Sequence, residues 1–217
     1  MLKKITVALL GMGAALLAST GWALDAGDIL VRLGPIGVFP NDRSTSLNNL
    51  GISDAKVSVG NAWSAGLTLA YMATENIGIE LVGAYPFTHN IKGDGSISGL
   101  GKIGDTKQLP PTLLAQYYFF PKGPVRPYLG AGINYTIFFD TNGNYPVKSI
   151  DLSNSWGWAG EVGVDVDLNK DWFVNVSGWY MDIKTQAKAK IAGVPETSKT
   201  NVNIDPFVLM FAFGTRF

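Results

Sequence analysis

Apolar and polar residues alternate with a period of two along much of this chain, which is the pattern of a β-strand with one apolar face. The alternation is clearest from Trp156 to Leu168, where charged residues occupy one parity only. After a tight turn at 169–171 it resumes from Trp172 to Asp182. The same pattern predicts six further strands, at residues 28–38, 62–73, 77–85, 112–120, 129–139 and 207–217.

The connections between these strands alternate in length. Three are short, near 74–76, 121–126 and 169–171, and four are long and rich in Gly, Asn, Ser and Asp, near 40–57, 91–108, 140–155 and 186–201. An open sheet edge in hydrocarbon would leave backbone groups without hydrogen-bond partners, so a membrane sheet must close. The sequence therefore predicts an all-β fold, an eight-stranded antiparallel up-and-down transmembrane β-barrel with long extracellular loops and short periplasmic turns.

A soluble β-sandwich or lipocalin-like barrel is the alternative fold. Its outer face would be polar, whereas here the charged parity is the minority face of a narrow barrel. Trp156, Trp158 and Trp172 lie near strand ends on the apolar parity, as in an interfacial aromatic girdle. The membrane barrel is the interpretation that accounts for them.

Residues 1–23 have the three parts of a secretory signal. Lys3 and Lys4 are basic, Ile5 to Ala18 is apolar, and Gly21-Trp22-Ala23 places small residues around a large one. The apolar run is shorter than the roughly 20 residues that a membrane helix needs. We expect cleavage after Ala23, which leaves residues 24–217 as one barrel domain in the outer membrane of a Gram-negative bacterium.

Composition excludes several functional classes. The signal carries two of the 17 basic residues and none of the 17 acidic ones, so the mature chain has a formal charge of −2 and no basic excess for nucleic acid. Cysteine is absent, and the single His89 belongs to no Ser–His, Asp–His or metal-ligand motif. The Gly-rich stretch at 93–104 is interpreted as a flexible loop rather than a phosphate loop. We expect no enzyme activity, metal or cofactor.

Strand parity also assigns the barrel interior. Inward apolar positions should line the outer half as a lumen or substrate path: Val82, Leu114, Tyr118, Phe138, Trp179, Met181, Val208 and Met210. Inward polar positions should form a layer in the periplasmic half: Glu80, Gln116, Glu161, Asp165, Asp167 and Arg216. An eight-stranded barrel is only just wide enough for side chains or one small ligand, so the apolar residues either fill the core or line a path.

Prolines predict a weak point in the barrel wall. Pro86 lies late in the strand at 77–85, and Pro110 and Pro111 precede the neighbouring strand at 112–120. Proline has no N–H, so the ladder between these strands must lose hydrogen bonds there. Because the polar layer would resist an apolar solute, we hypothesise a lateral gap here that leads into the membrane. The alternative is that the prolines only end strands near the extracellular rim.

Five blocks in order resemble the OmpW family of outer-membrane proteins, which includes the AlkL-type uptake proteins. They are Tyr71–Gly78, Leu109–Gln116, Arg126–Tyr135, Ser155–Gly157 and Asp171–Ile183. The resemblance implies an eight-stranded barrel with a hydrophobic lumen and a role in passing small hydrophobic molecules across the outer membrane. Segments 40–57 and 186–201 match least and would help to set substrate choice. Membrane lipid and small hydrophobic solutes are the implied partners.

The last strand ends on an aromatic residue of the lipid-facing parity. This terminal Phe217 is similar to the signal that the outer-membrane assembly machinery recognises. Two functions remain open for the whole barrel. It is either a passive conduit for small hydrophobic compounds, or a structural or adhesive barrel with a plugged core and partner-binding loops.

Overall fold

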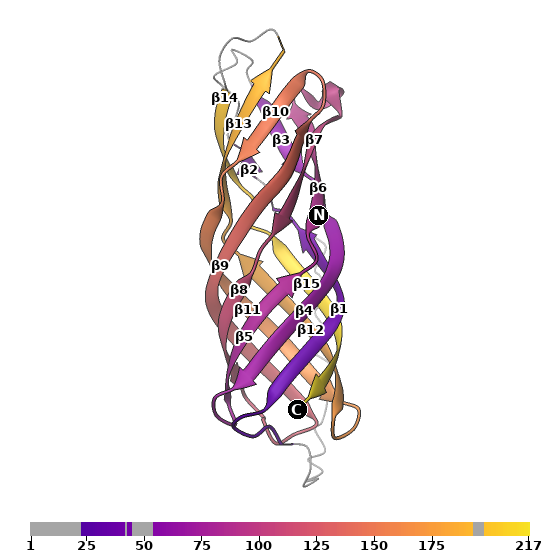
Figure 1. Cartoon of the computed structure of the whole chain (residues 1–217), viewed down its shortest axis with the longest axis vertical. Coiled ribbons are helices and arrows are strands. Elements are labelled where there is room, and N and C mark those ends of the chain that lie inside the picture. The colour runs from indigo at the N-terminus through magenta and orange to yellow at the C-terminus, as the bar shows by residue number, and fades with distance from the viewer. Residues whose placement is uncertain (1–22, 42, 45–53, 193–197) are drawn as a thin grey trace, which may run out of the picture.

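The computed structural model describes residues 23–41, 43–44, 54–192 and 198–217. Eight long strands form one closed antiparallel cylinder (Figure 1): β1 (Ile29–Phe39), β4 (Ala62–Met72), β5 (Ile77–Ala84), β8 (Thr112–Tyr118), β9 (Val125–Gly143), β11 (Ser155–Asp167), β12 (Trp172–Met181) and β15 (Phe207–Arg216). Each strand pairs with the next in this order, and β15 pairs with β1 to close the ring. The predicted barrel is confirmed.

The long connections contain further strands, so they are more regular than expected. β3 (Ala55–Val59), β6 (Phe87–Gly95) and β7 (Lys102–Leu109) extend the barrel sheet beside β9, and the short η2 (Ser98–Leu100) joins β6 to β7. A second sheet consists of β10 (Val147–Leu152), β13 (Lys184–Ile191), β14 (Ser198–Asn203) and β2 (Arg43–Ser44). The Gly-rich stretch at 93–104 is therefore largely a hairpin rather than a flexible loop.

These two upper sheets are ordered because they bury apolar side chains between them. Ile91 and Ile103 on one sheet pack with Val147 and Ile150 on the other. Figure 1 shows the extension rising from the barrel at the end opposite the short turns. Within the described part of the chain, no helix is long and apolar enough to cross a membrane.

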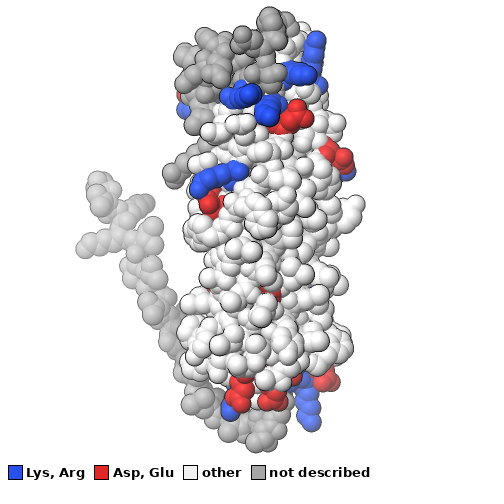
Figure 2. Space-filling model, turned by 60° about the vertical axis from the view of Figure 1, so that its left-hand side comes forward, with Lys and Arg blue, Asp and Glu red and all other residues white. Residues whose placement is uncertain are grey.

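The outer surface of the barrel is a continuous apolar band. In the described barrel strands, Asp140 near the upper end of β9 is the one exposed position that carries a charged side chain. Figure 2 shows that Lys, Arg, Asp and Glu gather at the two ends of the molecule. The band holds exposed aliphatic and aromatic side chains that include Leu33, Leu67, Leu69, Ile79, Leu81, Leu113, Leu129, Ile133, Val162, Val176, Leu209 and Phe211.

Aromatic pairs mark both borders of this band. At the upper border the ring centroids of Tyr135 and Trp156 are 4.5 Å apart, and those of Trp158 and Tyr180 are 5.4 Å apart. At the lower border Trp172 stacks on Phe213 at 4.9 Å. Two aromatic girdles around an apolar band are the arrangement that a bilayer requires of a transmembrane barrel.

The band gives the first prediction. Val176 lies midway along β12, opposite Phe211 and Val164 in the two adjacent ladders. Replacing Val176 with Arg should lower the free energy of unfolding in lipid vesicles by about 2–4 kcal/mol, because the charge would lie near the bilayer midplane. Urea titration followed by tryptophan fluorescence measures the change.

The matched control is Thr88→Arg, at an exposed position on β6 above the band. It should leave the unfolding free energy nearly unchanged. Equal losses in the two variants would contradict the placement of the membrane.

Candidate functional site

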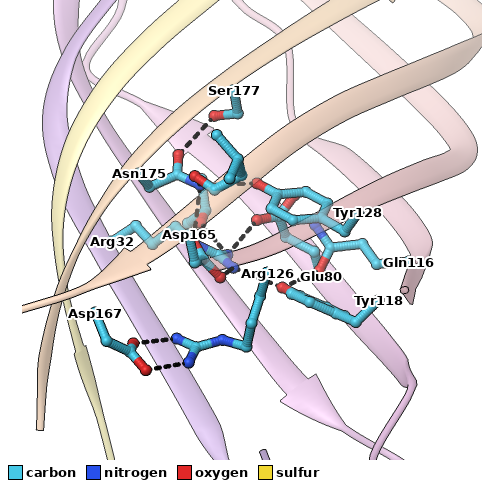
Figure 3. Close-up of polar contacts among 12 residues, drawn as sticks. Arg32, Glu80, Gln116, Tyr118, Arg126, Tyr128, Asp165, Asp167, Asn175 and Ser177 are labelled. Carbon is cyan, nitrogen blue, oxygen red and sulfur yellow. Dashed lines mark hydrogen bonds and ion pairs between the residues drawn. The ribbon is translucent and has the colours of Figure 1, made fainter. Parts of the chain in front are cut away.

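A buried guanidinium group in the lower half of the barrel connects strands that are not neighbours in the wall. Arg32 of β1 donates from Nη1 to Glu80 Oε1 of β5 at 2.9 Å. Its Nη2 and Nε donate to the two carboxylate oxygens of Asp165 on β11, at 2.9 and 3.1 Å. All three side chains are 1% exposed or less. Figure 3 shows these groups pointing toward one another inside the barrel.

Neutral polar side chains extend this contact into a layer. Arg32 Nη2 also donates to the hydroxyl of Tyr118 at 2.6 Å, and that hydroxyl donates to Gln116 Oε1 at 3.2 Å. Gln116 Nε2 donates to Glu161 Oε2 at 2.9 Å, and Asn175 Nδ2 donates to Asp165 Oδ1 at 2.8 Å. We call this set the polar layer; its members are Arg32, Glu80, Gln116, Tyr118, Tyr128, Glu161, Asp165, Asn175 and Ser177.

The polar layer is rich in carboxyl groups relative to cations. Glu80, Glu161 and Asp165 face one guanidinium. Glu80 Oε2 and Glu161 Oε1 are buried and have no hydrogen-bond partner within the described residues. A solute moving straight down the barrel would have to displace these buried hydrogen bonds, which is unfavourable for an apolar molecule.

Four of the six residues predicted for this layer meet in it: Glu80, Gln116, Glu161 and Asp165. Asp167 instead forms a two-bond ion pair with Arg126 nearer the short turns (Figure 3). Arg216 lies at the end of β15, where it donates to the carbonyl oxygens of Ala23 and Lys170.

Five members of the polar layer are missing from the predicted layer, and Arg32 is the charged one among them; the others are Tyr118, Tyr128, Asn175 and Ser177. Arg32 lies on the polar parity of the first predicted strand, so parity places it inside the barrel as it placed Glu80. Parity gives no distance across the barrel, however, and the partners of Arg32 come from positions 48 and 133 residues away.

An apolar cluster lies above the polar layer. Six of the residues predicted for the path pack together there, all 3% exposed or less: Val82, Leu114, Trp179, Met181, Val208 and Met210. Phe138 is partly buried against them. Tyr118 is not a member, because its hydroxyl binds Arg32 and Gln116 in the polar layer. The apolar cluster fills the barrel at this height.

A cavity of about 290 Å³ lies above the apolar cluster, between the two upper sheets. We call it the upper pocket. Its lining is mostly aliphatic and includes Val59, Ile91, Ile103, Ile150, Leu152, Ala189 and Ile191. It shares Val57, Phe138, Ala187, Val202 and Ile204 with the apolar cluster, which therefore forms its floor. Most of the lining comes from segments that composition assigned to loops, which is why sequence reasoning missed it.

Two polar side chains of the upper pocket bind each other. Both are buried: His89 of β6 and Gln108 of β7 are 1% and 2% exposed. His89 Nδ1 lies 2.7 Å from the carbonyl oxygen of Gly60, and His89 Nε2 lies 3.0 Å from Gln108 Nε2. Burial lowers the pKa of His89 below its usual range, although the bond to Gly60 opposes this shift. His89 is therefore neutral at pH 7.

The barrel wall has a break beside this pocket. The β5–β8 ladder ends at the pair Val82–Thr112, and the β6–β7 ladder begins at Phe87–Gln108. No pairing joins residues 83–86 to residues 109–111 in the described ladders. Tyr85 N–H donates to Ala65 on the far side, and Tyr135 N–H donates to the Pro111 carbonyl. Pro86, Pro110 and Pro111 all lie within this ladder break.

In the described residues, no cluster of His, Cys, Asp and Glu could hold a metal ion. The site is thus an apolar pocket above an apolar cluster, with a ladder break at its side and a polar layer beneath. Together with the closed barrel and apolar outer band, it defines an outer-membrane β-barrel protein whose interior is apolar in the upper part and polar in the lower part.

Comparison with known proteins narrows this class. The sequence profile of the OmpW family matches residues 25–217. Outer membrane protein W of Escherichia coli (strain K12) is 44% identical over 223 residues, with 100% of both chains covered. Outer membrane protein AlkL of Ectopseudomonas oleovorans is 29% identical over 220 residues, which cover 95% of this chain and 94% of AlkL.

A crystal structure of the outer membrane protein OprG from Pseudomonas aeruginosa has a TM-score of 0.84 and 39% identity. The match covers 90% of this chain and 98% of that one. This chain belongs to the OmpW family and is a Gram-negative outer-membrane barrel. In such barrels the short turns face the periplasm, so the upper pocket faces the cell exterior.

The polar layer gives the second prediction. Replacing Arg32 with Met should lower the free energy of unfolding by about 3–5 kcal/mol, because Glu80 and Asp165 would stay buried without their cation. Urea titration in lipid vesicles measures the loss. Arg32→Lys keeps the positive charge but not the two hydrogen bonds to Asp165, so its free energy of unfolding should fall by less than that of Arg32→Met. A smaller loss in Arg32→Met than in Arg32→Lys would contradict this account.

His89 gives the third prediction. The pKa of His89 is lower in the folded protein than in the unfolded chain, so the unfolded chain binds a proton at a higher pH. The contribution of neutral His89 to the free energy of unfolding is therefore fully present above about pH 6.5, the pKa of an unperturbed histidine. It is lost as the pH falls toward the pKa of the folded state. The loss cannot exceed about 1.4 kcal/mol per pH unit. Urea titrations at pH 7.5 and 5.5 should show it in the wild type, and His89→Gln should remove this part of the pH dependence.

Proposed function

We propose that this protein is a passive channel for the uptake of small hydrophobic molecules, with lateral exit into the membrane. The observation that supports it is the position of the upper pocket. It faces the cell exterior, its floor is the apolar cluster, and Gln108 in its lining borders the ladder break. An apolar solute that leaves water for this pocket gains roughly 25 cal/mol per Å² of apolar surface buried.

The polar layer supports a lateral rather than an axial route. Continuing downward would bring the solute against the buried ion pairs of Arg32 with Glu80 and Asp165. The ladder break between β5–β6 and β7–β8 offers a way out above that layer, where fewer backbone hydrogen bonds must separate. Pro86, Pro110 and Pro111 keep the ladder from closing there, because they have no N–H to donate.

The predicted substrate path fits this route in its upper part. Val82, Leu114, Phe138, Trp179, Met181, Val208 and Met210 would form the apolar surface beneath the pocket rather than an open tunnel, since they pack together. Similarity to AlkL agrees with a hydrophobic cargo, as the family resemblance implies. The proposal gives the chain no catalytic role.

Two proposed processing steps accompany this function. The cleavable signal at residues 1–23 lies almost wholly outside the described residues and stays a prediction. Phe217 is the proposed recognition signal for the assembly machinery. Its side chain is exposed, while its backbone exchanges two hydrogen bonds with Ile29, each 3.0 Å long.

A structural or adhesive barrel is the second candidate function. It is favoured by the filled interior, in which the apolar cluster and the polar layer occupy the barrel at two heights. The ordered upper sheets would then act as a scaffold for partner binding. Uptake of an apolar solute separates the two candidates, since only the channel requires it.

The ladder break gives the fourth prediction. Because the natural chain has no cysteine, Pro86→Cys and Pro111→Cys can be joined selectively by a reducible bifunctional crosslinker. Crosslinking should reduce cellular uptake of naphthalene at least 10-fold if the lateral gap must widen. Reduction of the linker should restore it. Radiolabelled solute in whole cells measures the rate.

The matched control joins Leu69→Cys to Leu81→Cys, which are paired in the intact β4–β5 ladder. This crosslink should leave uptake unchanged. Uptake that persists when residues 86 and 111 are joined would rule out lateral exit. Uptake that never exceeds that of cells without the protein would favour the structural or adhesive role.

A further inference from the structure

The hydrogen bonds of His89 fix the orientation of Gln108 in the upper pocket. The carbonyl oxygen of Gly60 can only accept, so His89 Nδ1 must carry the proton that it shares with Gly60. In the neutral ring Nε2 is then an acceptor. Its neighbour at 3.0 Å, Gln108 Nε2, must therefore be the donor. This assignment follows from donor and acceptor chemistry alone.

Gln108 retains unused hydrogen-bonding capacity after this contact. A primary amide has one carbonyl oxygen and two N–H groups, and only one N–H binds His89. Within the described residues, no hydrogen bond to the carbonyl oxygen of Gln108 is found, and the side chain lines the upper pocket. The carbonyl oxygen and the second N–H can therefore each take a partner in the pocket, so this amide is suited to a ligand group that both donates and accepts.

The surroundings of Gln108 define the charge of that group. Among the described residues that line the upper pocket there is no Lys, Arg, Asp or Glu, and His89 is neutral. An ionised ligand would enter an apolar cavity without a counter-charge, which is strongly unfavourable. A neutral hydroxyl fits, because its proton can go to Gln108 Oε1 and its oxygen can accept the remaining N–H.

The cavity size limits the apolar part of the ligand. A cavity of about 150 Å³ lined by aliphatic side chains takes one benzene molecule. The upper pocket, at about 290 Å³, is roughly twice as large. It therefore suits a body of about two fused rings, or an alkyl chain of similar volume.

We propose that the upper pocket selects hydrophobic molecules that carry one neutral hydroxyl group, an apolar alcohol or phenol, and that Gln108 recognises the hydroxyl. His89 is a positioning residue, since it holds the amide and touches the ligand only through it. This inference rests on the proposed function, because it names the class of molecule that the same pocket takes up.

Binding of two matched probes tests the inference. Full-length mature protein in lipid nanodiscs is dialysed at pH 7.5 against naphthalene or 2-naphthol, and uptake by empty nanodiscs is subtracted. 2-Naphthol should bind roughly 5- to 30-fold more tightly, the range expected for one or two neutral hydrogen bonds. In Gln108→Leu this preference should disappear while the affinity for naphthalene stays within about 2-fold.

Thr185→Val is the matched control. Thr185 also lines the upper pocket, but its hydroxyl already donates to the Ser153 carbonyl at 2.7 Å. Its replacement should leave the preference for 2-naphthol intact. If Gln108→Leu does not fold, the side-chain amide ¹⁵N resonance of Gln108 in the wild type serves instead. It should shift with 2-naphthol and not with naphthalene.

The outcomes separate this inference from the proposed function. Equal affinity for the two probes would overturn the hydroxyl preference and assign the Gln108 oxygen to a water molecule, with the channel proposal intact. A preference that Thr185→Val removes, or that Gln108→Leu retains, would overturn the role of Gln108. If neither probe binds above empty nanodiscs, the upper pocket is not a hydrophobic binding site and the proposed function fails.

Discussion

The structure depends on one constraint, that backbone N–H and C=O groups in hydrocarbon must find partners within the protein. Eight ladders meet it by closing a ring, in which β15 pairs with β1 at residues 30–33 and again at residues 36–39. The ladder break at residues 83–86 and 109–111 lies at the top of that ring, where the chain leaves the band. Backbone groups at the break form hydrogen bonds with other strands; the Tyr85 N–H, for example, donates to the carbonyl oxygen of Ala65. The ladder break therefore lies at the rim of the barrel.

The interior is divided into two environments by the same closed wall. Below, carboxyl groups and Arg32 satisfy one another across the barrel, and partners come from opposite sides of the ring. Above, Trp179, Met210 and their neighbours form an apolar cluster, in which Thr112 and Asn134 each contact the sulfur of Met181. Under the proposed function, the boundary between these environments decides which direction an apolar molecule can take. The polar layer is thus a structural support for the barrel and, under the proposed function, the reason for lateral exit.

The proposed selectivity of the upper pocket needs little polar chemistry. Most of its lining is aliphatic, and under the proposed function this would supply affinity without discrimination between apolar molecules of similar size. His89 and Gln108 add a single oriented amide at the edge of the ladder break. In the proposed recognition, this amide distinguishes a hydroxyl from a hydrogen atom, because only the hydroxyl can complete the hydrogen bonds of the amide.

The sequence by itself determined the eight strands, the closed barrel and which side chains face inward, because alternation with period two is a local property of the chain. It placed Glu80, Asp165 and Trp179 inside correctly for this reason. Only the tertiary structure decided which residues are in contact. Arg32 binds Asp165, Tyr118 joins the polar layer, and Arg216 binds the carbonyl oxygen of Ala23 at the periplasmic end. It also decided that the long connections form two facing sheets around a pocket. Register and distance across a barrel arise from closure of the whole ring, and no local pattern carries them.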